Sequence, residues 1–307
     1  MSAQGGPPVV IVGGPTASGK SAAAEMLARM VGGEVINADS MQVYRDLRIL
    51  SARPTASDQR SVPHHLYGHV DGSERYSAGR FVSEAVPIIE KLRAEGAIPV
   101  ICGGTGLYLK SLTEGLSPIP EVPEEVSVRA GVAFDADPAA FRTKLLEADP
   151  AMERLEPNDR QRHVRAVAVL EATGRPLSDW QKEPRRKPLD APFLETCLLP
   201  PRETLYENCD RRFLKMMEEG AVQEVRALMA RGLSPILPVM KALGVPELAA
   251  FIRGDLEEGE AVEMAAQETR RFAKRQMTWF RNQTDWPVFS AGDHLVEAAA
   301  KKVMARR

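Results

Sequence analysis

The sequence has little cysteine, and the cysteines present match no ligand spacing. Three occur in 307 residues, at positions 102, 197 and 209. Zinc sites and redox motifs need closely spaced cysteine pairs, which this sequence lacks. An odd and scattered set indicates reduced thiols, as in the cytoplasm, where we expect this protein to act.

The sequence also lacks segments that direct a chain to a membrane. No stretch approaches the roughly 20 consecutive apolar residues of a transmembrane helix. The first residues carry no basic region ahead of an apolar one, so we expect no signal peptide. We therefore expect no membrane partner. Nothing in the sequence demands an obligatory protein partner either, and we expect a monomer.

An excess of positive charge is missing as well. The 40 Lys and Arg residues are balanced by 42 Asp and Glu residues, for a net charge of -2. A protein that binds nucleic acid without specificity is usually basic, so such a partner must meet local basic patches here. The hydrophobic fraction of 44% over 307 residues supports two domains, or one domain with a large insertion.

One specific motif is present near the N-terminus. Residues 14–21 fit G-x-x-x-x-G-K-[ST], a loop whose backbone N–H groups cradle phosphate oxygens. A β-branched apolar run at 8–12 predicts a strand before it, and 22–31 predicts a helix after it. We call residues 14–21 the phosphate-binding loop. The residues expected to bind a diphosphate are Gly14, Pro15, Thr16, Ala17, Ser18, Gly19, Lys20 and Ser21.

The loop does not identify the molecule that carries the phosphates. ATP, a nucleoside diphosphate and an isoprenyl diphosphate all present the same group, so ATP binding stays open. Mg²⁺ is the expected cofactor, because it accompanies phosphates and accepts a hydroxyl ligand such as that of Ser21. Lys20 adds a full positive charge to the partial charge of the helix N-terminus.

Alternating strands and helices predict an α/β fold. Further strands are expected at 33–37, 98–102, 195–199 and 287–289. Further helices are expected at 78–95, from 107, and near 203–219, 221–231, 239–253, 259–283 and 293–305. Residues 45–77 are polar and rich in turns. The pattern favours a parallel sheet covered on both faces, as in P-loop nucleoside triphosphate hydrolases.

The alternation breaks at two proline-rich stretches. Between them, 124–179 is predicted to be all helix. We therefore expect a catalytic core formed by 1–117 and 191–307, interrupted by an all-helical insertion domain at 118–190.

Five motifs in order carry a family resemblance. They lie at 14–21, 39–44, 103–108, 158–165 and 269–279. Together the motifs resemble the tRNA dimethylallyltransferases over residues 9–290. The resemblance implies transfer of a dimethylallyl group from dimethylallyl diphosphate to N6 of the adenine 3′ of the anticodon in tRNA, with release of pyrophosphate. The expected partner is the anticodon stem-loop, gripped by the insertion domain.

The resemblance also implies roles in catalysis. Thr16, Lys20, Ser21 and Arg212 would hold the diphosphate, whereas Arg211 is expected on the surface. Asp39 would take the proton from N6. Two other roles for Asp39 stay open: a Mg²⁺ ligand, and a residue that only caps a turn.

Contacts with tRNA are implied by the same resemblance. In the core they fall on Asp39, Ser40, Met41, Gln42 and Thr105, with Gln42 suited to a base edge. In the insertion they fall on Arg129, Gln161, Arg162, His163, Val164 and Arg165. Spacing alone would favour an ordinary charged surface helix beginning near Asp159, with 164, 167 and 168 as its buried face.

A second basic surface is predicted on the helix at 259–283. At about 100° per residue, five basic residues fall within an arc of about 140°. They are Arg270, Arg271, Lys274, Arg275 and Arg281, which we call the basic ridge. The ridge faces tRNA, the diphosphate or only solvent. One departure from the family is Val245 and Pro246, where a tyrosine and a lysine are frequent, which puts RNA contact there in doubt.

Three other functions would also use a phosphate-binding loop. A small-molecule kinase would use the same loop with ATP, but the strand at 98–102 leads into glycine rather than into an acidic residue. An isopentenyltransferase acting on free adenine nucleotide needs no insertion that grips RNA. A regulatory nucleotide-binding module would leave Asp39 without a purpose.

Overall fold

The computed structural model describes residues 6–306, so the expected absence of a signal peptide concerns residues outside it. The chain divides into two compact units. One ends at Thr113 and resumes at Pro188, and the other is Glu114–Lys187. The sequence predicted this insertion at 118–190, so the predicted bounds lie a few residues after the observed ones. Within residues 6–306, no helix is both long enough and apolar enough to span a membrane.

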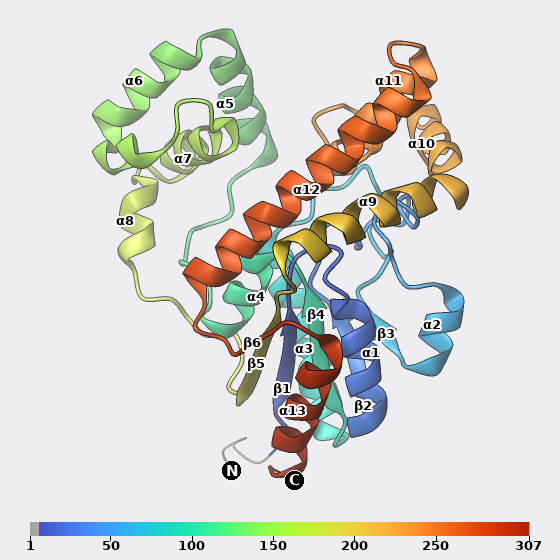
Figure 1. The fold of residues 1–307 in the computed structure, drawn as a ribbon. Helices are drawn as coiled ribbons and strands as arrows, with labels where there is room; N and C mark the ends of the chain where they lie inside the picture. The colour runs from blue at the N-terminus through green and yellow to red at the C-terminus, as the bar shows by residue number, and fades with distance from the viewer. Residues whose placement is uncertain (1–5, 307) are drawn as a thin grey trace. The chain divides into compact units, whose positions relative to one another are not determined.

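The larger unit contains a parallel sheet of six strands (Figure 1). The strands are β1 Val9–Gly13, β2 Gly33–Asn37, β3 His64–His65, β4 Ile98–Gly103, β5 Phe193–Leu198 and β6 Val288–Phe289. Their order across the sheet is β3-β2-β4-β1-β5-β6. β4 therefore lies between β1 and β2, so the loops that follow these three strands meet at one edge.

Helices cover both faces of the sheet. α1 Lys20–Val31 and α13 Gly292–Met304 pack on one face, and α3 Ala78–Ala94 and α4 Gly106–Thr113 pack on the other. Side chains alternate accordingly along β1, where Val9 and Ile11 face one layer and Val10 and Val12 face the opposite layer. The predicted α/β core is confirmed.

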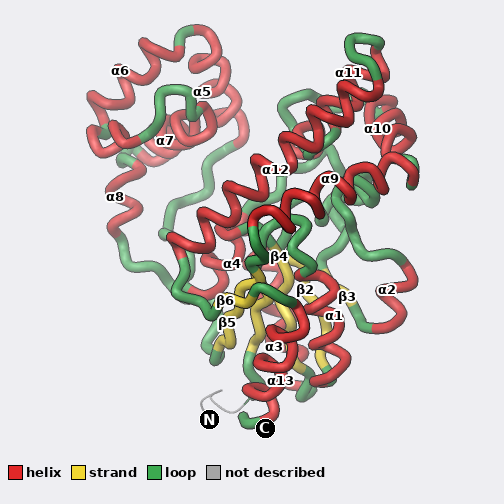
Figure 2. The backbone as a smooth tube through the Cα atoms, viewed as in Figure 1, coloured by secondary structure: helices red, strands yellow, loops and turns green. Residues whose placement is uncertain are grey.

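Four more helices form a layer beyond the carboxyl edge of the sheet. They are α9 Arg202–Glu218, α10 Ala221–Ala230, α11 Val245–Arg253 and α12 Glu258–Gln283. Their apolar faces enclose a separate core with residues 43–50. Figure 2 shows this layer as helices and loops, with the strands gathered elsewhere in the unit.

The single helix predicted at 239–253 was wrong. A 3-10 turn, η2 Pro238–Lys241, is followed by Gly244 and only then by α11. Gly244 has φ 85°, a conformation that side chains rarely adopt, and a Cβ there would lie 2.9 Å from Phe213. The chain therefore turns at Gly244 instead of continuing the helix.

Two short elements inside 45–77 were not predicted. α2 Ala56–Ser61 begins with a capping box between Thr55 and Asp58. β3 has two residues and exists because it pairs with Val35 and Ile36 of β2. The two histidines of β3 lie half-buried in this pair.

The smaller unit is helical. It contains α5 Glu124–Ala136, α6 Pro138–Ala148, η1 Pro150–Arg154, α7 Arg160–Thr173 and α8 Leu177–Lys182. The two ends of the unit are joined by a bridge between Leu116 and Arg186 and by an ion pair of 2.6 Å between Glu114 and Arg185. The all-helical pattern predicted for this segment is confirmed.

Candidate active site at the edge of the sheet

The phosphate-binding loop lies between β1 and α1. Lys20 opens α1 and is only 9% exposed. Its Nζ donates a hydrogen bond of 3.1 Å to the carbonyl of Pro15, which folds the side chain back over the loop. Burial lowers the pKa of Lys20, and the negative charge of Asp39 partly opposes this shift. The loop is thus a cationic and largely dehydrated cradle.

Two hydroxyl groups are available at this loop. The Thr16 hydroxyl accepts a hydrogen bond of 2.6 Å from the guanidinium of Arg212. The Ser18 hydroxyl is buried and finds no hydrogen-bond partner in the described part of the chain. Because an unpaired buried hydroxyl is costly, Ser18 points to a ligand that supplies its partner. Both residues were predicted to bind the diphosphate.

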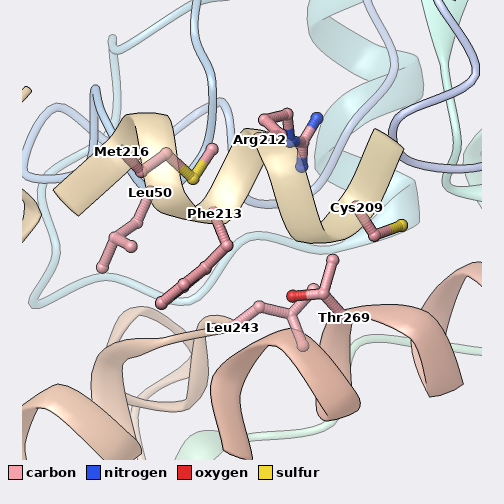
Figure 3. Close-up of a pocket in the computed structure, with 7 residues that line it drawn as sticks. All are labelled: Leu50, Cys209, Arg212, Phe213, Met216, Leu243 and Thr269. Atoms are coloured by element: carbon pink, nitrogen blue, oxygen red, sulfur yellow. The ribbon is translucent and has the colours of Figure 1, made fainter. Parts of the chain in front are cut away.

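Arg212 rather than Arg211 reaches the loop. Both lie on α9, but Arg211 is exposed and bonds Asn208 on the same helix. Burial lowers the pKa of Arg212, and Asp39 is among the nearby groups that oppose the shift. Beside Arg212, a small pocket between α9 and α12 is lined mainly by apolar side chains, and Phe213 points into it from α9 (Figure 3).

Asp39 follows β2 and is half-buried. One of its carboxylate oxygens accepts the backbone N–H of Met41 at 2.9 Å, so Asp39 does cap a turn. Its charge also acts on both donor-side cations, Lys20 and Arg212. The carboxylate therefore lies near the two cations that would hold a diphosphate.

The neighbours of Asp39 are held by the loop after β4. The hydroxyl of Thr105 accepts the backbone N–H of Ser40 at 3.0 Å and lies 3.3 Å from the Ser40 hydroxyl. The amide nitrogen of Gln42 is already engaged, because it donates to the carbonyls of Ser51 and Ala52. These two bonds leave the side-chain oxygen of Gln42 as the atom that could accept a hydrogen bond from a base edge.

The insertion residues differ from one another in exposure. Gln161, Arg162 and Arg165 are exposed on α7. Arg162 pairs with Asp159 at 3.3 Å, and Arg129 of α5 pairs with Glu171 at 3.4 Å.

His163, expected to contact tRNA, is instead fully buried in this unit. Its ring nitrogens bond the carbonyl of Asp159 and the guanidinium of Arg142. Val164 is half-buried against the apolar cluster around Phe134. The predicted RNA contact through the His163 side chain is therefore wrong, because the face of α7 that carries His163 packs against the rest of this unit.

The basic ridge on α12 is only partly a free surface. Arg270 is half-buried and pairs with Asp210 of α9, which removes it from the ridge. Arg271, Lys274 and Arg275 are exposed and line a shallow hollow with Thr278. The opposite face of α12 carries Ala273 and Phe280, which are buried.

The site offers few metal ligands of its own. In residues 6–306 no three His, Cys, Asp or Glu side chains are grouped to hold a metal. Burial raises the pKa of the neighbouring Cys102 to about 11, so this thiol stays neutral. The exposed hydroxyl of Ser21 fits a Mg²⁺ ion, since Mg²⁺ takes most of its oxygen ligands from substrate phosphates and water.

Gln276 is a site residue that sequence reasoning missed. It lies on α12 and is 6% exposed. Its amide accepts the N–H of Thr16 and donates to the carbonyl of Gly104, both at 2.8 Å. The available signal was a glutamine on the apolar stripe of this helix, between Ala273 and Phe280. Such a polar side chain is rarely buried without partners.

Known proteins resemble this chain along most of its length. A family model described as IPP transferase matches residues 42–283, and one described as isopentenyl transferase matches 7–67. A tRNA dimethylallyltransferase of Hyphomonas neptunium is 50% identical over 285 residues, covering 91% of this chain and 90% of that protein. That of Rhodospirillum rubrum is 51% identical over 286 residues, covering 92% and 88%.

Solved structures agree with these relatives. The tRNA isopentenylpyrophosphate transferase of Bacillus halodurans has a TM-score of 0.70 at 30% identity, covering 97% of this chain and 96% of its own. A eukaryotic dimethylallyltransferase acting on tRNA has a TM-score of 0.81 at 27% identity, covering 97% and 80%. The kinase and free-nucleotide alternatives are not favoured. The chain belongs to the tRNA dimethylallyltransferase family.

Proposed function

We propose that this enzyme transfers a dimethylallyl group from dimethylallyl diphosphate to N6 of the adenine 3′ of the anticodon in tRNA. The bond between the allylic carbon and the bridging diphosphate oxygen breaks, and pyrophosphate keeps the electron pair. A bond forms from that carbon to N6, and one N6 proton passes to Asp39. The observation that carries the proposal is the Asp39 carboxylate at the edge of the sheet, whose charge acts on Lys20 of the phosphate-binding loop and on Arg212 of α9, the residue that bonds Thr16.

The loop and Arg212 stabilise the leaving group. Negative charge grows on the diphosphate as the carbon–oxygen bond breaks. Lys20 is buried and Arg212 is half-buried, so their charges act through a medium that screens them less than water does. The unpartnered hydroxyl of Ser18 would donate to a phosphate oxygen. The hydroxyl of Thr16, which already accepts from Arg212, would donate to another.

Mg²⁺ would be held by the hydroxyl of Ser21 together with the diphosphate. When bound, it would neutralise charge on the phosphate oxygens. The carboxylate of Asp39 is an alternative ligand, because Mg²⁺ prefers oxygen donors. We assign Asp39 to proton transfer, because the amine of adenine must lose a proton and Asp39 stands at the same edge of the sheet.

The adenine must leave its stack before it can react, as other bases do in enzymes that modify them. Ser40 and Thr105, which bond each other, would contact the extruded nucleotide beside Asp39. Gln161, Arg162 and Arg165 present exposed donors that suit RNA phosphates. The family to which the chain belongs supports this assignment, whereas helix spacing alone would not.

The test is a transfer assay with two arms. The first supplies labelled dimethylallyl diphosphate and unmodified tRNA, and the second supplies ATP alone. Label in tRNA, lost when the target adenine is replaced, supports the proposal. ATP turnover without label in tRNA would contradict it and favour a kinase.

A further inference from the structure

Gln276 joins two loops that the chemistry requires to be held together. Its side-chain oxygen accepts the N–H of Thr16, and its nitrogen donates to the carbonyl of Gly104. These partners precede it by 260 and 172 residues in the chain. Both bonds measure 2.8 Å, and the glutamine is 6% exposed. A buried amide with both of its groups satisfied is rigid.

Each end of this bridge leads to one half of the reaction. Thr16 belongs to the phosphate-binding loop, and its hydroxyl bonds Arg212. Gly104 immediately precedes Thr105, whose hydroxyl holds the N–H of Ser40. Asp39 directly precedes Ser40 in the sequence. One side chain thus connects the diphosphate cradle to the loop that carries the base.

The local sequence is adapted to the bridge. A Cβ at Gly104 would lie 2.3 Å from the Gln276 nitrogen and 3.0 Å from the carbonyl of Gly14. Glycine is therefore required for the two loops and α12 to meet this closely. The flanking residues Lys274 and Arg275 are exposed, so Gln276 alone of these three turns inward.

The bridge also decides which backbone groups serve the donor. Because the N–H of Thr16 is occupied by Gln276, Thr16 offers the diphosphate only its hydroxyl.

We propose that Gln276 is a positioning residue that fixes the diphosphate cradle relative to Asp39. The proposal rests on the proposed function, since it assigns Asp39 and the loop to one reaction. Its physical basis is alignment: a displacement of about 1 Å between reacting groups costs on the order of 10²-fold in rate.

Two variants of Gln276 separate this role from a general effect on folding. Gln276→Glu keeps the acceptor for the N–H of Thr16 but replaces the donor to Gly104 with a second acceptor. Gln276→Met keeps the length and removes both bonds. Gln267→Met, at an exposed position of the same helix outside the basic ridge, is the matched control.

The measurement is single-turnover transfer of label to tRNA, with affinities for pyrophosphate and tRNA measured on the same samples. We expect the rate to fall about 10²-fold in both Gln276 variants, with affinities within about threefold of the parent. Gln267→Met keeps the parental rate. Assays run well below the thermal midpoint of each variant, and Gly104→Ala, which displaces Gln276, should reproduce the defect.

Folded Gln276 variants that transfer within threefold of the parental rate would overturn the proposal. So would a loss confined to pyrophosphate affinity, because Gln276 would then serve only the cradle. If Gln276→Met does not fold, Gln276→Glu and Gly104→Ala decide the question. Failure of the proposed function looks different, since the parent itself would then leave tRNA unlabelled.

Discussion

The core site and the α7 surface of the insertion hold their polar residues in opposite ways. In the core, Thr16 and Gln276 are at most 7% exposed and bond partners far away in the sequence. On α7, Arg162 is 73% exposed and pairs with Asp159, three residues away. Groups that carry chemistry are fixed by buried bonds, whereas groups suited to RNA phosphates stay in water, where long side chains adapt to a partner.

The largest effect on this comparison is expected when Asp39 loses its ability to accept a proton but keeps its turn. Asp39→Asn keeps an oxygen that can accept the N–H of Met41 but cannot take a proton. We expect the chemical step to slow by about 10²–10⁴-fold, the usual contribution of a general base. Single-turnover transfer measures this step, and tRNA affinity should change far less. Full activity would mean that Asp39 only caps its turn.

The next prediction tests the close packing of Gly106 against Trp279 in the core. A Cβ at Gly106 would lie 2.4 Å from the ring of Trp279, with no space to accept it. Gly106→Ala should lower the free energy of unfolding by about 1–3 kcal/mol, as overpacking does. Gly259→Ala is the matched control on α12, where nothing lies within 4 Å of an added Cβ. Chemical denaturation compares the two, and equal stabilities would refute the close approach.

The pH dependence of the donor step tests the buried lysine. Burial lowers the pKa of Lys20 in the free enzyme, so its charge is lost at a lower pH than for an exposed lysine. The protonated form binds the diphosphate, so kcat/KM for the donor should fall up to tenfold per pH unit above that pKa. Lys20→Arg, which stays charged, should remove this fall even if its overall rate is lower. A parental profile that stays flat to pH 10.5 would contradict the assignment.

The smallest effects are expected on α7. Arg162→Ala and Arg165→Ala should each weaken tRNA binding several-fold and reduce the slope of log affinity against log salt by about one. Lys144→Ala removes one exposed charge from another helix of the same unit and serves as the control. A salt titration of tRNA binding measures all three. Slopes that match the parent in the two arginine variants would exclude these residues from the RNA interface.

Local signals in the sequence predicted much of the core. The glycines and lysine of residues 14–21, preceded by an apolar run, specify the loop and its strand without help from distant residues. Asp39 could be placed at the same edge because parallel strands end together. The two-residue strand β3 could not be predicted, because only its pairing with β2 makes it a strand.

The missed features depend on contacts between distant parts of the sequence. Gln276 finds its partners 172 and 260 residues away, and no local pattern encodes that pairing. His163 was placed on the wrong side of α7 because spacing favoured 164, 167 and 168 as the buried face. Its contact with Arg142, on another helix, turns position 163 inward instead. The choice of Arg212 over Arg211 came from resemblance, and its bond to Thr16 gives the physical reason.

The most direct measurement is a crystal structure with an unreactive analogue of dimethylallyl diphosphate and the anticodon stem-loop. The account predicts the diphosphate on residues 14–21 and the target N6 within about 2.6–3.2 Å of the Asp39 carboxylate. The allylic carbon should lie between N6 and the leaving oxygen. An N6 amine that bonds another group, with Asp39 turned toward a metal or only toward Met41, would contradict it.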